Sequence, residues 1–329
     1  MRVSVNINIV RQEFNSERKC MKIAIIGIGG IGGYFGSEFI KQGHEVTLIS
    51  RLQTLNELNH FGLNVQCQDG KRRFKQGKDF QLKRIDSLET EIFQLVLLCV
   101  KTYDIPNILG SLSNIPQDTL VLHLQNGINT YEQLSEVLST DQLLPGVTYV
   151  EAEKLSPGEY KQSGDVVKIL YGYKGSRLIE AARELGVSMS SKSMECKYTD
   201  TIDLDLWIKF IFIASVGGIT ALAGLPIKKI FNEPQGFQVI NDCMDEILEV
   251  GKATGIPITS AIKQDTLNFI KDNLQDIQAS MHTDKIKKNR LELDALNGYI
   301  CNLAGKYQMT TPINQLITMG LTEFKNGVS

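Results

Sequence analysis

The stretch Lys22–Ile26 (KIAII) runs directly into GIGGIG, and this junction decides the predicted fold. A short, continuous apolar run is typical of a strand that is buried on both faces in a parallel sheet. Glycines in the pattern GxGxxG then allow a tight turn, a close approach of the backbone to a pyrophosphate, and packing of the next helix on the strand. The alternative is a glycine-rich turn needed only for packing. The predicted dinucleotide-binding residues are Gly27, Ile28, Gly29, Gly30, Ile31 and Gly32.

Further elements follow in a βαβ order. A helix is expected at 31–43, and strands are expected at 45–50, 94–100, 119–124 and 144–150. Asp69-Gly70 between two short alternating runs predicts a hairpin. This alternation predicts an α/β, Rossmann-type N-terminal domain with a doubly wound, mostly parallel sheet.

The alternation of predicted strands and helices ends after Pro157. Residues 158–173 are expected to form an antiparallel hairpin that turns near Ser163-Gly164, followed by a helix at 176–186. From about residue 200 the period is helical, which predicts an all-α C-terminal domain. Its helices are expected at 204–222, 235–254, 260–274, 291–306 and 312–325. We therefore expect an N-terminal extension (1–20), a dinucleotide-binding Rossmann-like domain (21–195) and a helical substrate or catalytic domain (196–329).

Composition narrows the class of protein. The 329 residues carry 35 Lys and Arg against 37 Asp and Glu, a net charge of −2, which argues against a nucleic-acid surface over the whole protein. The 6 cysteines are scattered without a CxxC pair, which favours reduced thiols in the cytoplasm over disulfides or a metal site. Residues 1–20 lack the apolar run of a secretory signal, and are either an extension outside the core or an added edge strand.

Residues 207–225 are apolar and long enough to span a bilayer. Lys209 and Gly217-Gly218 lie inside this run, and no second run of this kind follows. We therefore expect a buried helix of a soluble domain and no membrane partner, with a membrane span as the alternative.

The lysine of this apolar run has two interpretations. Burial disfavours the charged form, so the pKa of Lys209 is expected to fall below its usual value of about 10.4. Such an ammonium can give a proton to a developing alkoxide and polarise a carbonyl. The alternative is a lysine whose stem covers apolar surface while its charge stays in water.

Cofactor choice is expected to depend on the end of the second strand. Dinucleotide sites that take NAD usually place a carboxylate there, whereas this chain has Arg51, whose guanidinium suits a 2′-phosphate. The sequence therefore favours NADPH, unless Arg51 is an ordinary surface residue. Lys101 and Asn126 follow two other strands, where an open parallel sheet binds its ligand, and are expected to contact cofactor or substrate unless they are ordinary loop residues. His123 is expected to pack inside its strand end.

Together these residues resemble the ketopantoate reductase (2-dehydropantoate 2-reductase) family over nearly all of 21–325. The resemblance is carried by MKIAIIGIGGIGGYFG (21–36), CVKTYD (99–104), HLQNGI (123–128), LWIKF (206–210), SMHTD (280–284) and LELDALNG (291–298). It implies two domains with a cleft between them, and NADPH-dependent reduction of a 2-oxo acid to the (R)-2-hydroxy acid in pantothenate and coenzyme A synthesis. A homodimer is a possible assembly.

The resemblance also implies roles for single residues. It makes Lys209 the general acid, Ser280 a substrate-binding residue, and Lys101 and Asn126 contacts to cofactor and substrate. It places Glu292 near the nicotinamide ribose and the catalytic lysine, and gives Ala152 a backbone contact to the cofactor. If both Ser280 and Glu292 serve one site, the helix must break between them, and 287–289 is the expected place.

The sequence departs from the family at two positions. Asparagines that follow the lysine in well-characterised members are replaced here by Ile213 and Gly217. Two hydrogen-bonding groups of the substrate site are therefore missing, which weakens the assignment of the substrate more than that of the reaction. The alternatives are a related reductase that forms another D-2-hydroxy acid, and a non-catalytic NADPH-binding protein.

Overall fold

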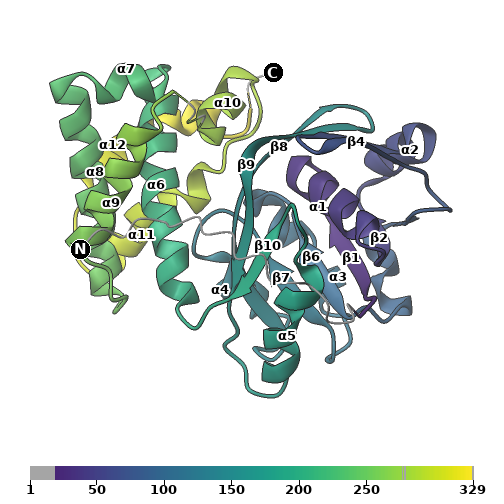
Figure 1. The fold of residues 1–329 in the computed structure, drawn as a ribbon. Helices are drawn as coiled ribbons and strands as arrows, with labels where there is room; N and C mark the ends of the chain where they lie inside the picture. Colours follow the sequence, from purple (N-terminus) through teal and green to yellow (C-terminus); the bar gives the residue numbers. More distant parts are fainter. Residues whose placement is uncertain (1–18, 276, 278, 328–329) are drawn as a thin grey trace.

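The computed structural model describes residues 19–275, 277 and 279–327, as an α/β domain followed by a helical region (Figure 1). The predicted fold class is confirmed. The alternating residues at 3–9, which we considered as an added strand, lie outside the described residues.

A parallel core carries the predicted nucleotide loop. Strand β1 (Lys22–Ile26) pairs in parallel with β2 (Glu45–Ile49) on one side and with β6 (Leu95–Leu98) on the other. The sheet continues in parallel from β6 to β7 (Leu120–His123) and then to β8 (Leu143–Ser156). The apolar side chains of β1, β6 and β7 are almost wholly buried, as the continuous apolar runs predict. The strand order is β4-β3-β9-β8-β7-β6-β1-β2-β5, with β10 (Glu195–Tyr198) beside β9 (Glu159–Tyr171).

The remaining elements of the α/β part are short. The Asp69-Gly70 prediction is confirmed, since β3 (Leu63–Cys67) and β4 (Gly70–Phe74) form an antiparallel hairpin there. Strand β5 (Gln81–Lys83) extends the sheet beside β2. The helices are α1 (Gly30–Lys41), α2 (Leu52–Phe61), α3 (Leu109–Leu112), α4 (Thr130–Leu134) and α5 (Ile179–Met189), with 3-10 turns at Ile85–Thr90 and Thr102–Asn107.

The predicted hairpin over 158–173 is wrong. Strands β8 and β9 form one long antiparallel ribbon that turns at Pro157-Gly158, so residues 159–171 are a single strand. Gly164 lies inside β9, close to where the register shifts between Tyr149 and Glu151. Both Gly158 and Gly164 have positive φ, at 72° and 74°. A glycine in this conformation suits a turn or a bulge equally well, so the local sequence does not distinguish them.

The helical region follows the predicted order, with two additions. The expected helices correspond to α6 (Ile202–Ala223), α8 (Pro234–Ala253), α9 (Ser260–Asp272), α11 (Asn297–Lys306) and α12 (Pro312–Leu321), and α12 is followed by a 3-10 turn at Thr322–Phe324. Two short helices, α7 (Ile227–Phe231) and α10 (Ser280–Ile286), were not predicted from the sequence. The helix expected to begin at 291 begins at Asn297 instead, because Leu296, with φ −109° and ψ −103°, interrupts it after a 3-10 turn at Leu293–Ala295.

Helix α6 is the central element of the helical region (Figure 1). By length and composition it could cross a membrane. It packs against α8, α10, α12 and β8, and it buries apolar side chains such as Trp207, Phe210 and Ile211. This packing supports the interpretation of α6 as a buried helix. Because β10 pairs with β9 in the sheet, we propose the domain boundary between Tyr198 and Ile202 rather than at 195.

Candidate active site

The glycine loop connects β1 to α1 as predicted. Gly27 has φ 94°, and a Cβ there would lie 2.6 Å from the backbone nitrogen of Val100. Its own N–H donates to the carbonyl of Ile49 at 3.0 Å, which ties the loop to the end of β2. A side chain at Gly27 would therefore suffer both backbone strain and a clash, as expected for the first glycine of this motif.

The residues present fit the phosphates of a dinucleotide. Gly29 precedes the first turn of α1, a 12-residue helix whose first N–H groups have no partner within the helix. A Cβ on Gly29 would meet nothing within 4 Å, so the approach to this helix end is open. A Cβ on Gly30 would overlap the carbonyl of Ala152, which places the Ala152 backbone over the start of α1. The predicted backbone contact of Ala152 with the cofactor is compatible with this position.

Arg51 lies at the same end of the parallel β1–β2 pair as the glycine loop. It follows β2, precedes the first residue of α2 and is exposed. Within the described residues it forms no ion pair, so its guanidinium is available to an anion beside the glycine loop. The position suits the predicted contact with a 2′-phosphate.

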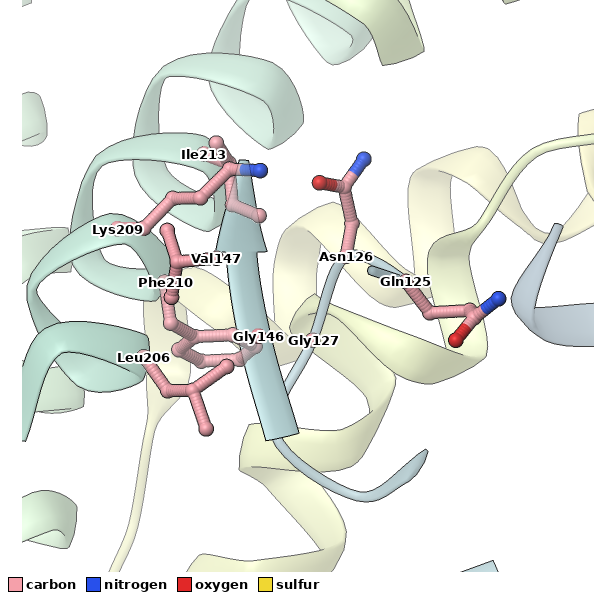
Figure 2. A pocket seen from close by; sticks show the side chains of 9 residues that line it. All are labelled: Gln125, Asn126, Gly127, Gly146, Val147, Leu206, Lys209, Phe210 and Ile213. Carbon is pink, nitrogen blue, oxygen red and sulfur yellow. The ribbon is translucent and has the colours of Figure 1, made fainter. Parts of the chain in front are cut away.

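Lys209 and Asn126 line one small cavity between the two domains (Figure 2). Lys209 projects from α6, and Asn126 follows β7. In Figure 2 the two polar side chains point toward the same space. The other lining residues are Gln125, Gly127, Gly146, Val147, Leu206, Phe210 and Ile213.

The ammonium of Lys209 is held in a largely apolar setting. Its Nζ donates to the carbonyl of Thr148 on β8 at 2.9 Å. Burial lowers the pKa of Lys209 to about 8, while the charge of Glu292 acts in the opposite direction. A lysine with this pKa is still protonated at neutral pH and can release its proton more readily than an exposed lysine.

The loop that carries Asn126 is fixed from both sides. Gln125 Nε2 donates to the carbonyls of Leu98 and Val100 at 3.0 and 3.1 Å. Gly127 has φ 101°, and a Cβ there would lie 2.8 Å from the carbonyl oxygen of Ala295 in the helical region. Asn126 is therefore positioned by a loop that contacts both domains.

Lys101 pairs with two carboxylates of the helical region. Its Nζ lies 3.1 Å from Glu292 Oε2 and 3.2 Å from Asp284 Oδ2. The other oxygen of Glu292 accepts hydrogen bonds from the Thr102 backbone N–H at 3.1 Å and from its hydroxyl at 3.0 Å. Lys101 and Glu292 thus form a direct contact between the two domains.

The electrostatics of this cluster keep both partners charged. Burial alone would raise the pKa of Glu292, but the charge of Lys101 and the hydrogen bonds from Thr102 hold it below its usual value. Burial alone would lower the pKa of Lys101, and the charges of Glu292 and Asp284 raise it instead. The carboxylate of Glu292 bonds directly to Lys101 and Thr102, and it acts on Lys209 through its charge.

Ser280 is not brought into the Lys209 cavity. It is the first residue of α10, it is exposed, and it is not among the residues that line the cavity. Helix α10 ends before Lys288, which has φ 58°, so the predicted break within 287–289 is confirmed. Next to Ser280, the Met281 side chain lies 3.6 Å from a Cβ placed on Gly217.

Three residues of this site were not predicted from the sequence. Thr102 and Gln125 lie beside predicted residues in the motifs CVKTYD and HLQNGI, so their position at strand ends was a usable signal. Asp284 lies 183 residues from Lys101, and no local pattern pairs them.

The other predicted features lie apart from the cavity. His123 is buried, as expected, and neither ring nitrogen has a hydrogen-bond partner in the described part of the chain. Among residues 19–275, 277 and 279–327, no group of three or more His, Cys, Asp or Glu side chains is placed to hold a metal ion. All the cysteines are free thiols.

Comparison with known proteins places the two regions in one family. The family model described as ketopantoate reductase PanE/ApbA matches residues 23–174, and the model for the C terminal part of the same family matches residues 201–324. An uncharacterized oxidoreductase of Bacillus subtilis, YkpB, is 25% identical over 306 residues, which cover 93% of this chain and 99% of that protein. A 2-dehydropantoate 2-reductase of Halobacterium salinarum is 24% identical over 294 residues, which cover 89% of this chain and 95% of that protein.

Solved structures share the whole fold. A ternary structure of D-mandelate dehydrogenase with NADH and anilino(oxo)acetate has a TM-score of 0.85 at 20% identity, covering 93% of this chain and 98% of that one. A PanE/ApbA family ketopantoate reductase from Ralstonia eutropha has a TM-score of 0.82 at 23% identity, with the same coverage of 93% and 98%.

Proposed function

The chain belongs to the ketopantoate reductase PanE/ApbA family, and from this premise we propose that it uses NADPH to reduce 2-dehydropantoate to (R)-pantoate in pantothenate and coenzyme A synthesis. The family is one of oxidoreductases that act on a CH–OH group with a nicotinamide dinucleotide. The observation that carries the proposal is the Lys209 ammonium, held in an apolar cavity beside Asn126 and between the domains.

The residues of the cavity can perform the proton part of a carbonyl reduction. The cofactor, when bound, supplies the hydride. Lys209 is protonated at neutral pH, since its pKa is about 8, and its Nζ can give a proton to the oxygen of the substrate carbonyl. Asn126 lines the same cavity and can hydrogen-bond the substrate. Lys101 remains charged and can bind an anionic group of substrate or cofactor.

The choice of NADPH rests on Arg51. This residue is exposed, follows β2, and has no ion-pair partner among the described residues. A 2′-phosphate would gain a planar, permanently charged partner there, whereas the ribose hydroxyls of NADH would find no carboxylate at the end of β2. The D-mandelate dehydrogenase of similar fold was solved with NADH, so both cofactors belong in the test.

One observation favours a second candidate, reduction of an apolar 2-oxo acid to a D-2-hydroxy acid. Ile213 lines the cavity one helical turn from Lys209, where the resemblance leads us to expect an asparagine. Gly217, another turn further, faces the apolar Met281. A substrate hydroxyl would have no hydrogen-bond partner on this wall, while a branched or aromatic side chain would pack against it. The similar fold of D-mandelate dehydrogenase supports the same candidate.

The test is oxidation of NADPH and of NADH, followed at 340 nm, with 2-dehydropantoate, 2-oxo-3-methylbutanoate, 2-oxo-4-methylpentanoate and phenylglyoxylate. A kcat/KM at least tenfold higher for 2-dehydropantoate supports the first candidate, and the opposite order supports the second. Ile213→Asn is then expected to shift the preference toward the hydroxylated substrate. Tight NADPH binding without turnover of any acid would indicate the non-catalytic alternative.

We also propose that the protein is cytoplasmic, that it has no nucleic-acid or membrane partner, and that it forms a homodimer. Size-exclusion chromatography with light scattering tests the assembly.

A further inference from the structure

We propose that Asp284 is a positioning residue, which together with Glu292 fixes the ammonium of Lys101 for ligand binding. The inference rests on the proposed function, because it assigns Lys101 to the cofactor and substrate site. It is based on the position of Lys101, which follows β6 and lies between two carboxylates of the helical region. Its Nζ is 3.2 Å from Asp284 Oδ2 and 3.1 Å from Glu292 Oε2.

The carboxylate of Asp284 is itself held in place. Its Oδ2 faces Lys101, and its Oδ1 accepts a hydrogen bond from Asn289 Nδ2 at 3.1 Å. The backbone N–H of Asn289 also donates to the Asp284 carbonyl at 2.8 Å. The turn that brings Asn289 back depends on the left-handed conformation of Lys288. Asp284 is therefore a fixed anchor, unlike most surface partners of a lysine.

Two anchors change what Lys101 can do. An ammonium has three N–H donors, and the two carboxylates engage two of them, which leaves one for a ligand. The Lys101 side chain is 41% exposed, so a ligand can approach it. With Glu292 alone, the ammonium could rotate about a single contact and would lose more conformational entropy when it binds a ligand. Asp284 is thus expected to act on ligands through Lys101.

The domain contact does not depend on Asp284 alone. Glu292 also accepts two hydrogen bonds from Thr102, and the guanidinium of Arg290 lies 4.3 Å from the centre of the Tyr103 ring. Removing the carboxylate of Asp284 therefore leaves the segment around Glu292 docked on the end of β6. An Asp284 variant is expected to fold and to report on the position of Lys101.

The experiment is a double-mutant cycle of Asp284→Ala, Lys101→Ala and the two together, with kcat and KM measured separately for the best 2-oxo acid and NADPH. Asp284→Ala is expected to raise KM about tenfold, with a smaller change in kcat, because one charge-assisted hydrogen bond to Lys101 is lost. Asp284→Asn, which keeps one acceptor, is expected to lie between it and the unaltered protein. The double variant is expected to be no worse than Lys101→Ala alone.

The control is Asp245→Ala, which removes an aspartate from a 2.6 Å ion pair with Lys263, and is expected to leave kcat and KM unchanged. The inference is overturned if Asp284→Ala has the kcat and KM of the unaltered protein while Lys101→Ala does not. It is also overturned if the fold-change in KM of the double variant equals the product of the fold-changes of the two single variants. Absence of turnover in the unaltered protein would contradict the proposed function instead. In that case the Kd for NADPH would be measured for the same variants. An unchanged Kd in Asp284→Ala would overturn the inference. Weaker NADPH binding in both Asp284→Ala and Lys101→Ala would support it.

Discussion

Replacing Lys209 with methionine should separate the chemistry of this protein from its stability. Methionine has a similar length and fills the same part of the apolar cavity, but it carries no proton to donate. We expect kcat to fall by a factor of about 10² to 10⁴, the usual contribution of a positioned general acid. This corresponds to about 3 to 5 kcal/mol of activation free energy. The Kd for NADPH should change by less than about threefold.

The same substitution should increase the free energy of unfolding, although it lowers kcat. Burial lowers the pKa of Lys209 from 10.5 to about 8, so the charged form is destabilised in the folded state by at most about 3 kcal/mol. This penalty is complete below pH 8 and fades as the pH rises from 8 to 10.5, because the unfolded lysine binds its proton more tightly. Methionine removes the penalty but loses the hydrogen bond to the Thr148 carbonyl, worth about 1 kcal/mol. A net gain of about 1 to 2 kcal/mol at pH 7 follows.

Three measurements test this reasoning. Steady-state NADPH oxidation gives kcat, urea unfolding at pH 7 gives the free energy of unfolding, and the pH profile of the unaltered protein reports the proton donor. In that profile kcat/KM should fall about tenfold per pH unit above pH 8. Phe210→Leu, a neighbouring change without a titrating group, controls for altered packing and should keep the pH profile. A kcat within tenfold of the unaltered protein, or a lower unfolding free energy for Lys209→Met, would refute the argument.

Other parts of the structure give independent tests. Gly29→Ala should leave the free energy of unfolding nearly unchanged, because the added Cβ meets nothing within 4 Å. It should raise the Kd for NADPH tenfold or more, because the methyl group fills the approach to the helix end. An unchanged Kd, measured by cofactor fluorescence, would show that the phosphates bind elsewhere. Arg51→Ala should weaken NADPH at least tenfold while the Kd for NADH changes little, and equal effects on both would contradict a 2′-phosphate contact. Burial lowers the pKa of His123 to about 3, so the folded protein should lose up to about 1.4 kcal/mol per pH unit below pH 6.5, as the unfolded chain takes up the proton. His123→Phe should flatten that dependence between pH 6.5 and 5 in urea unfolding, and an unchanged slope would assign it to other groups.

The nucleotide-binding half could be predicted because its signals are local. Each buried parallel strand has a continuous apolar run, and the glycine loop follows its strand without interruption. The long ribbon of β8 and β9 was predicted incorrectly, since a glycine with positive φ serves a turn at Gly158 and a bulge near Gly164 alike. The helix interruption at Leu296 was also missed, because residues 291–296 contain no glycine or proline that would mark it.

Sequence alone determined the fold class, the glycine loop, Arg51 at the end of the second strand, and a lysine within an apolar helix. Only the tertiary structure decided which groups meet. Lys101 lies 183 residues from Asp284 and 191 from Glu292, and the carbonyl that receives the Lys209 hydrogen bond is 61 residues away. Local structure follows from neighbouring residues along the chain, whereas the protonation and orientation of a side chain follow from burial and charges that distant segments supply.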